Sequence, residues 1–451
     1  MSGTKTPPRA FKVPSGRLSR LARLGAMTTG VAGNMAMSGL RDIARGNRPD
    51  IRDLFLDPRN IRRVTDDLAR MRGAAMKIGQ LLSMDTGDIL PPELSQIMAR
   101  LRAEADFMPP KQLKTVLTKA WGKGWLTQFE RIDVRPVAAA SIGQVHRAKT
   151  RDGRDMAIKV QYPGVARSID SDVANVAALI KLSGLIPKGF DLTPYLEEAR
   201  RQLHEEADYE REGHSLRTFC QLLQEDESFV LPELHEDFTT SDVLAMSFVP
   251  AAPIEQAVDL DQDRRNLLTQ NLITLVLREL FEFGVMQTDP NFANYRFDPA
   301  TDRLVLLDFG ATRTIAPKTA DQYRRLFRAG LAGDTTALRA VAQDIGFITP
   351  DTAPHHQRAL LGIMETACAA FQGQADFDFG DTSFVRDMND AGAALAADGF
   401  VPSQVPMDVL YVQRKLGGTF LLAHRLKAKL PLRDMVYPFL ATQAIGGTTP
   451  P

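Results

Sequence analysis

The feature that most constrains this fold is a pair of short apolar runs joined by a turn. The runs are GQVHRAKT (143–150) and MAIKVQY (156–162), and Arg151-Asp152-Gly153-Arg154 separates them. Alternating apolar residues are typical of strands, and Asp-Gly supplies the positive backbone angles that a tight turn requires. The sequence therefore predicts an antiparallel hairpin within a small sheet.

Mainly helical patterns surround this hairpin. Apolar residues recur three and four apart from residue 60 to 104, where Pro91 and Pro92 begin a second helix, and the patterns of 111–130 and 168–224 are also helical. Two more strand candidates lie in 230–250, and the chain from about Asp263 onward is mainly helical apart from LVLLDFG (304–310). This order predicts an α+β fold, with a sheet-bearing lobe followed by a helical lobe.

Composition excludes several classes of protein. The chain has 451 residues, and its 55 basic and 55 acidic residues give no net charge, so no global field argues for nucleic acid as a partner. Two cysteines, Cys220 and Cys368, rule out a disulfide framework or a multi-cysteine zinc site.

The beginning of the chain allows two interpretations. The first 24 residues carry six basic side chains and no acid, and residues 24–40 are uncharged but too short and too polar to span a membrane. This part either contacts an anionic membrane surface or is a disordered tail followed by a helix packed on its own domain. An acid-free, arginine-rich start also resembles a mitochondrial transit peptide.

Four polar residues that could carry out phosphoryl transfer follow one another along the sequence in the order found in kinases. Such a site needs a cation at the phosphates, metal ligands and a group that orients the acceptor. Lys159 of MAIK supplies the cation, Asp289 and Asn294 stand five apart in TDPNFAN, and Asp308 follows 19 residues after Asp289 in LVLLDFG. Each feature alone has an ordinary interpretation, as an exposed lysine or a turn, but together they favour a kinase-like site.

Residue chemistry assigns roles to these positions. Magnesium prefers carboxylate and amide oxygens, so Asn294 and Asp308 are the predicted metal ligands, and Asp289 is the predicted general base. Lys159 is expected to bridge the phosphates while Glu206, on a helix, holds it in place; the alternative for Glu206 is a solvated acidic face.

The nucleotide pocket is expected to have two further parts. Where a kinase carries a flexible glycine loop this chain has Ala138, Ala139, Ala140 and Ser141, which predict a stiffer lid of different shape. Met246 and Phe248 occupy the place of an adenine-contacting hinge.

These motifs resemble the UbiB family of atypical kinase-like proteins, called ADCK proteins in mitochondria and linked to ubiquinone (coenzyme Q) biosynthesis. The likeness covers roughly residues 60–345. It is carried by MKIGQLLSM (the KxGQ motif with Lys77 and Gln80), AAASIGQVH, MAIKVQYPGV, EADY (the ExD motif with Glu206 and Asp208), TDPNFAN and LLDFGATR.

The resemblance implies a bilobal protein-kinase-like fold with an N-terminal helical extension over the active site and a mainly helical C-terminal lobe. Domains are expected at 1–24 (basic tail), 25–130 (KxGQ extension), 131–250 (N-lobe) and 251–451 (C-lobe). ATP or ADP with Mg2+ is the expected cofactor. The expected regulatory or pocket-occluding residues are Lys77, Gln80, Glu206, Asp208 and Glu212.

Two departures shape the functional hypothesis. Gln287-Thr288 replaces the histidine that many family members carry before the catalytic aspartate, and DFGATR runs into a helix without an APE signature or a long activation segment. These features favour an atypical kinase or ATPase in quinone-lipid biosynthesis over an ordinary protein kinase. The alternative is a nucleotide-dependent scaffold or lipid-extraction protein with little phosphotransfer.

The expected partners are isoprenoid-quinone biosynthetic enzymes or lipid precursors, together with a second copy of the chain in a homodimer. The expected location is the cytoplasm, peripheral to the inner membrane, or the mitochondrial matrix if the source is eukaryotic.

Overall fold

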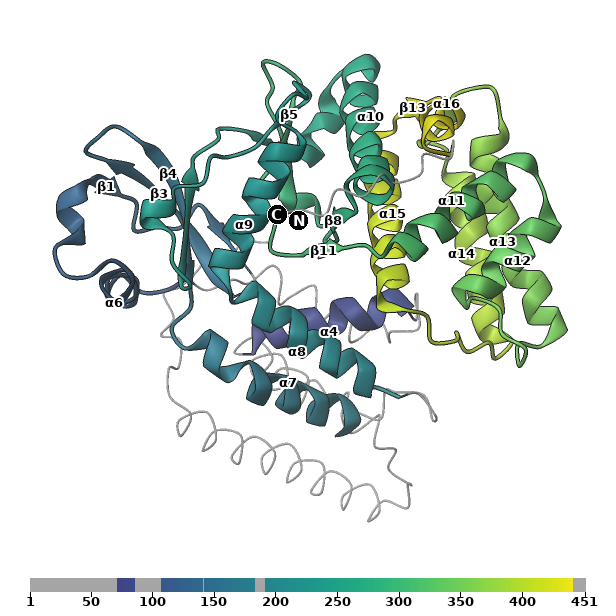
Figure 1. Cartoon of the computed structure of the whole chain (residues 1–451), viewed down its shortest axis with the longest axis horizontal. Helices are drawn as coiled ribbons and strands as arrows, with labels where there is room; N and C mark the ends of the chain where they lie inside the picture. Colours follow the sequence, from purple (N-terminus) through teal and green to yellow (C-terminus); the bar gives the residue numbers. More distant parts are fainter. Residues whose placement is uncertain (1–70, 86–106, 141, 183–190, 441–451) are drawn as a thin grey trace, which may run out of the picture. The chain divides into compact units, whose positions relative to one another are not determined.

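The computed structural model describes residues 71–85, 107–140, 142–182 and 191–440 (Figure 1). They fall into two compact units: Met1–Arg217 with Pro232–Phe248, and Thr218–Leu231 with Val249–Pro451. The predicted basic tail, the segment 24–40 and the helix begun by Pro91 and Pro92 lie outside the described residues. The domain boundaries predicted from sequence stay predictions.

The first unit contains a five-stranded sheet in the order β1-β3-β4-β6, with β2 paired to β3. The predicted hairpin is confirmed as β3 and β4, whose register runs from Gly143 opposite Gln161 to Lys149 opposite Asp155. Gly153 in its turn has φ 96°, the left-handed region that glycine tolerates. The strands are β1 (Phe129–Ile132), β2 (Ala138–Ala139), β3 (Gly143–Thr150), β4 (Asp155–Gln161) and β6 (Val243–Ser247).

An aromatic cluster and helix α6 (Pro110–Trp121) form the core of this sheet. Trp121 stacks on Phe129 with ring centroids 5.2 Å apart. The prediction of helix throughout 111–130 is wrong beyond Trp121, because Gly122 and Gly124 take φ values of 79° and 90° that end the helix. A short 3-10 turn (Trp125–Gln128) then leads into β1.

Helices α4 (Arg72–Asp85), α7 (Val165–Leu182) and α8 (Thr193–Glu206) pack against one another in the first unit (Figure 1). Ala75 and Ile78 on α4 and Ala199 on α8 are fully buried. The predicted helix over 168–224 is interrupted at Ala207–Asp208, after which α9 (Tyr209–Leu222) begins.

The second unit is mainly helical, as predicted. The apolar strand LVL of the LVLLDFG motif is confirmed as β10 (Leu304–Leu306), which lies in a small sheet of order β5-β10-β9-β7. Two more strand pairs, β8 with β11 and β12 with β13, accompany it. The short strands are β5 (Phe229–Val230), β7 (Ala252–Pro253), β8 (Val285–Gln287), β9 (Tyr295–Phe297), β11 (Thr312–Thr314), β12 (Phe377–Asp378) and β13 (Lys429–Leu430).

Helix α15 (Met407–Leu426) lies at the centre of the helical part, where Val409 and Val412 join one apolar core. Among the residues that the structure describes, no helix combines the length and apolar character needed to cross a membrane. The other helices of this unit are α10 (Gln262–Arg278), the π-helix η5 (Glu279–Phe283), α11 (Pro317–Ala332), α12 (Thr335–Ile345), α13 (Pro354–Gln372), α14 (Thr382–Ala397), α16 (Leu432–Val436) and the 3-10 helices η4 (Ile254–Asp259), η6 (Phe292–Asn294) and η7 (Tyr437–Leu440).

Candidate functional site

Lys159 on β4 is a buried cation held by a buried carboxylate. Its Nζ lies 2.8 and 2.9 Å from the two carboxylate oxygens of Glu212 on α9, and both residues are less than 10% exposed. The ring of Tyr209 lies 5.2 Å from the same ammonium group. Lys159 is therefore positioned by a charge-assisted contact, as a lysine that binds phosphate requires.

The sequence-based expectation that Glu206 holds Lys159 is corrected here, because Glu212 occupies that position. Glu206 instead forms an ion pair with Lys77 of α4, and both side chains are largely buried. Lys77 therefore lies inside the first unit. Within α4, the side chain of Gln80 lies outside the described part of the chain.

The break between α8 and α9 is fixed in place by hydrogen bonds. Gln161 at the end of β4 donates from Nε2 to the backbone carbonyls of Ala207 and Ser241, at 2.7 and 2.8 Å. Exposed Asp208 accepts from the backbone N–H of Arg211 and so caps the first turn of α9. The ExD residues Glu206 and Asp208 thus sit at a rigid junction beside the sheet.

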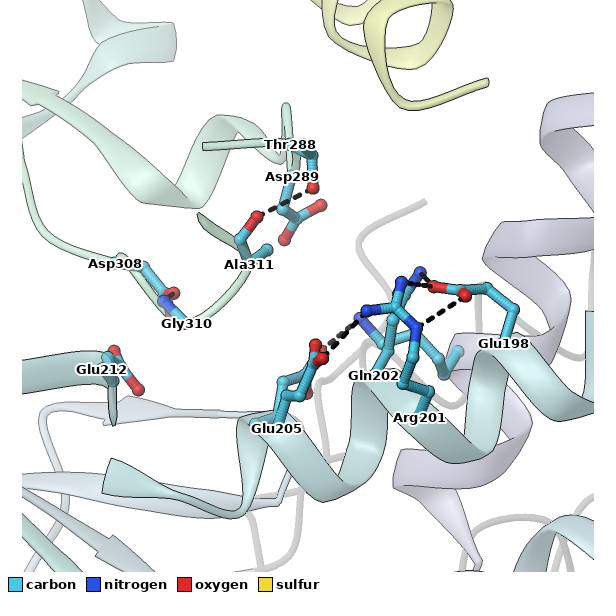
Figure 2. Close-up of polar contacts among 12 residues, drawn as sticks. Glu198, Arg201, Gln202, Glu205, Glu212, Thr288, Asp289, Asp308, Gly310 and Ala311 are labelled. Carbon is cyan, nitrogen blue, oxygen red and sulfur yellow. Dashed lines mark hydrogen bonds and ion pairs between the residues drawn. The ribbon is translucent and has the colours of Figure 1, made fainter. Parts of the chain in front are cut away.

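A network of ion pairs and hydrogen bonds runs along α8. Arg201 pairs with Glu198 and Glu205, and Gln202 donates to Glu198 at 2.6 Å (Figure 2). The Arg201 side chain is about half exposed, whereas Glu198 and Gln202 are buried, so the network joins the interior of the first unit to its surface.

The alanine-rich segment is an extended strand. Ala138 and Ala139 form β2, pair with Val145 and Gln144 of β3, and are exposed, as is Ala140 to a lesser degree. Ala140 donates from its backbone N–H to the carbonyl of Gly143 at 2.9 Å and closes a tight hairpin. The predicted stiffness thus has a structural basis in strand pairing. Ser141 at the tip lies outside the described residues.

Gly143 follows this tip and lies against two other segments. A Cβ atom there would come within 2.4 Å of the carbonyl oxygen of Val160 and 2.8 Å of the Tyr209 hydroxyl. Only glycine allows this close approach of β3 to β4 and α9.

A buried polar chain that sequence reasoning missed runs through the motif SIGQVH. Gln144 accepts from the backbone N–H of Met108 at 2.8 Å and donates from Nε2 to His146 Nε2 at 2.7 Å. His146 Nε2 is then an acceptor, so its Nδ1 carries the proton and donates to the carbonyl of Asp133 at 2.7 Å. Burial lowers the pKa of His146, which fits this neutral tautomer. The signal in the sequence is the alternate spacing of Gln144 and His146, which places both side chains on one face of the strand.

The predicted hinge residues lie on the strand next to Lys159. Met246 on β6 is buried and stands opposite Ala157 of β4. Phe248 donates its backbone N–H to Asp155, and the Arg147 guanidinium lies 4.1 Å from the centre of its ring. Phe248 is therefore fastened to the hairpin, and its contact with an adenine base stays a prediction.

In the second unit, the catalytic-loop residues lie close together. Asn294 donates from Nδ2 to both the backbone carbonyl and the carboxylate of Asp289, each at 3.2 Å. Thr288 donates from its N–H and its hydroxyl to the carbonyl of Ala311, which places this loop beside the segment after β10 (Figure 2). The five-residue spacing thus produces a closed polar loop.

Asp308 lies at the turn that follows β10. Its carboxylate accepts from the N–H of Gly310 at 3.0 Å, and the buried ring of Phe309 packs on Phe219. Asn294 and Asp308 line one small cavity of about 10 Å3, which has room for roughly a single water-sized particle. The two predicted metal ligands are therefore brought together.

The donor set fits a magnesium ion. Because the Nδ2 of Asn294 is directed at Asp289, its Oδ1 is the atom that can bind a metal, and Asp308 adds a carboxylate. Hard oxygen donors of this kind suit Mg2+.

Two basic residues of α15, which sequence reasoning missed, hold the catalytic loop. Arg414 Nη2 lies 2.6 Å from Asp289 Oδ1. Lys415 is fully buried and donates to the carbonyl of Gln287 and the hydroxyl of Tyr295, at 2.7 and 2.8 Å. The sequence signal is an Arg-Lys pair inside an apolar helix.

Lys415 also neutralises a buried acid. Its Nζ lies 3.1 Å from the carboxylate of Glu279, which is itself fully buried and accepts from the N–H of Gln287. Burial by itself would lower the pKa of Lys415, but Glu279 and Tyr295 outweigh it and the pKa is raised. Lys415 is therefore a permanent cation beneath the catalytic loop.

Comparison with known proteins gives a consistent result. The family description "ABC1 atypical kinase-like domain" matches residues 100–342. The mitochondrial atypical kinase COQ8 of Saccharomyces cerevisiae is 35% identical over 424 residues, which cover 94% of this chain and 84% of the yeast protein. The mitochondrial atypical kinase COQ8B of Rattus norvegicus is 36% identical over 433 residues, covering 95% of this chain and 81% of the rat protein.

A solved structure has a similar fold. It is the complex of Rv3197 with erythromycin from Mycobacterium tuberculosis, with a TM-score of 0.61 and 21% identity, and the match covers 83% of this chain and 95% of that one. At that identity the likeness concerns the fold alone. Together with the family match, it confirms the predicted α+β, kinase-like fold.

Proposed function

Because the chain belongs to the ABC1 (UbiB/ADCK) family of atypical kinase-like proteins, we propose that it binds ATP or ADP with Mg2+ and transfers or hydrolyses the terminal phosphoryl group. The pathway it supports is ubiquinone or related isoprenoid-quinone biosynthesis. The observation that carries the proposal is the Asp289–Asn294 loop, with Asp308 beside it on the same small cavity.

Each side chain has a chemical task in this proposal. Asn294 Oδ1 and the Asp308 carboxylate would hold the metal, which would supply positive charge at the phosphates. Asp289 accepts a proton or hydrogen bond from the attacking hydroxyl or water. Arg414 forms an ion pair with that carboxylate and orients it.

Lys159 contributes the phosphate-binding cation from the first unit. Its bidentate contact with Glu212 fixes the ammonium group before nucleotide arrives, so little ordering remains to be done on binding. Glu212 therefore takes the role of the helical carboxylate, and Glu206 with Lys77 is assigned to regulation of the same unit.

Calorimetric titration of the full chain with ATP and ADP, with and without Mg2+, tests the nucleotide proposal. Asp308→Asn is expected to abolish the magnesium dependence of binding, and Asp289→Asn is expected to retain binding and lose turnover by roughly 100-fold or more. The matched control is Asp298→Asn, a half-buried acid in the turn between β9 and β10 that accepts hydrogen bonds from Ala300 and Thr301 within that turn. Equal magnesium dependence in wild type and Asp308→Asn would refute the metal assignment.

Turnover separates the enzyme from the scaffold alternative. Nucleotide binding without any ATP hydrolysis, even with phenolic lipid precursors and membranes present, would leave the scaffold or lipid-extraction function. Robust phosphoryl transfer from ATP to generic peptides would instead support a protein-kinase function.

Pathway, partners and location are tested in cells. Deletion is expected to remove ubiquinone and accumulate a precursor, and affinity capture is expected to recover quinone-biosynthetic enzymes or a second copy of the chain. The relatives named as mitochondrial favour the matrix over the cytoplasm. Fractionation of the source cells and liposome co-sedimentation test this location and the peripheral membrane contact.

A further inference from the structure

The helical part of the second unit contains a large apolar cavity that is partly open to solvent. Its volume is about 500 Å3, and helices α10, α11, α13, α14, α15 and α16 supply its walls. Protein interiors contain few voids larger than a water molecule, whereas small-molecule sites measure roughly 300–1,000 Å3. The cavity has the dimensions of a binding site.

The lining specifies the chemistry of an occupant. Among the described residues that form the wall there is no Asp, Glu, Lys, Arg or His, and the polar side chains there are Tyr323, Asn389 and Thr419. Cys368 also lines it, and burial raises the pKa of this thiol to about 11, so it too is uncharged. An ionised group would lose its hydration here without gaining a counter-charge, so the occupant must be uncharged inside the cavity.

Helices α13 and α14 are poorly packed on this side. Of 19 residues in α13 only Leu361 is fully buried, and of 16 in α14 only Leu395. Phe384, Val385 and Met388 of α14 line the cavity and are half-buried. Further apolar contact on this face would bury surface that now lies open.

One wall is an aromatic cluster. Phe379, Phe384 and Phe420 line the cavity, and Phe377 packs on all three from outside the lining, with ring centroids 4.9 to 6.3 Å apart in the cluster. Because the rings are tilted relative to one another, both ring faces and ring edges are available to contact an apolar ligand.

The C-terminal residues of this chain are a poor occupant. Residues 441–451 read ATQAIGGTTPP, in which Ile445 is the one large apolar side chain. That composition supplies too little apolar volume to fill about 500 Å3.

We propose that this cavity binds an uncharged hydrocarbon-chain molecule of the lipid class. The inference goes beyond the proposed function, because none of the lining residues belongs to the catalytic loop or to the turn at Asp308. Its failure would leave the nucleotide proposal untouched, and the reverse also holds.

Binding of the uncharged fluorescent probe Nile red to the full chain tests the proposal. Wild type is expected to bind saturably, and a neutral long-chain alcohol is expected to displace the probe better than the fatty-acid anion of equal length. Ala367→Phe on α13 places a ring in the cavity and is expected to weaken binding at least about tenfold. The matched control is Ala369→Phe on the exposed side of the same helix, which is expected to bind like wild type.

A second pair of variants keeps the test valid if Ala367→Phe does not fold. Met388→Gln puts an amide on the cavity wall at nearly constant volume, whereas Asp387→Gln alters its exposed neighbour. Only Met388→Gln is expected to weaken the binding of Nile red.

Absence of saturable binding, or equal binding by Met388→Gln and Asp387→Gln, would overturn the proposal. Better displacement by the anion would refute the requirement for an uncharged occupant. A wild-type dimer that Met388→Gln converts to monomer in light scattering would assign the cavity to a second copy of the chain instead.

Discussion

Replacing Lys415 by methionine is expected to destabilise the second unit strongly. Methionine nearly preserves volume but leaves the fully buried carboxylate of Glu279 without its cation, and the carbonyl of Gln287 and the hydroxyl of Tyr295 without a donor. Removing one partner of a buried ion pair costs about 3–5 kcal/mol. For a unit of roughly 200 residues, that corresponds to a fall in Tm of about 6–20 °C.

Denaturant unfolding of the full chain followed by far-UV circular dichroism measures this loss. Tryptophan fluorescence is unsuitable, since Trp121 and Trp125 are the chain's two tryptophans and both lie in the first unit. The double variant Glu279→Gln with Lys415→Met removes the unpaired charge but keeps an acceptor for the N–H of Gln287, so it is expected to recover at least half of the loss.

A lysine on the surface provides the matched control for this experiment. Lys429 pairs with Asp378 at 2.9 Å, but both side chains are about half exposed, so Lys429→Met is expected to cost less than about 1 kcal/mol. A similar, small loss for Lys415→Met and Lys429→Met would refute the reasoning that a buried cation supports the catalytic loop.

Three further substitutions test other parts of the structure. Gly143→Ala is expected to destabilise the first unit, because its Cβ would collide with the backbone carbonyl of Val160; a lowered unfolding midpoint measures this, and an unchanged midpoint contradicts it. Burial lowers the pKa of His146, so the unfolded chain binds its proton first and stability falls as pH drops below about 6.5, levelling off below the folded pKa. His146→Gln is expected to flatten this slope in urea midpoints measured from about pH 7.5 to 5, and an identical slope would exclude His146 as its source. Gly418→Ala would bring a Cβ within 2.3 Å of Pro290, so faster amide exchange is expected in residues 288–294, and exchange equal to wild type would show that the loop does not need this close approach.

Local pattern predicted the elements that depend on neighbouring residues. The hairpin β3–β4 and the strand before Asp308 follow from alternation and turn chemistry, and the Asp289–Asn294 contact follows from a five-residue spacing. The side-chain roles of these residues as base, metal ligand and phosphate contact stay predictions.

The partner of Lys159 could not be predicted because a helix break changes the direction of every later side chain. The pattern from 168 to 224 indicated helix, and the structure divides its described part into α7, α8 and α9, with Ala207 and Asp208 between the last two. Across such a break the helical phase is lost, and Glu212 rather than Glu206 reaches Lys159.

The roles of Arg414 and Lys415 depend on contacts made more than 100 residues away along the chain. A basic pair in a helix indicates solvent exposure unless the buried acid it meets is known. Glu279 is that acid, and no local pattern connects it to α15.

The ion pairs of Lys77 and Lys159 flank the same helix break, and this gives Lys77 a physical route to the predicted phosphate-binding lysine. Lys77 holds the last residue of α8, Gln161 fixes the break itself to the end of β4, and Glu212, one turn into α9, holds Lys159 on that same strand. Gln161 holds Ala207 at the break through one hydrogen bond and Ser241 through another, so a displacement of α4 at Glu206 strains the contact between the break and β4. Regulation through the KxGQ helix therefore requires no direct contact between Lys77 and nucleotide, since the junction already connects the two lysines mechanically.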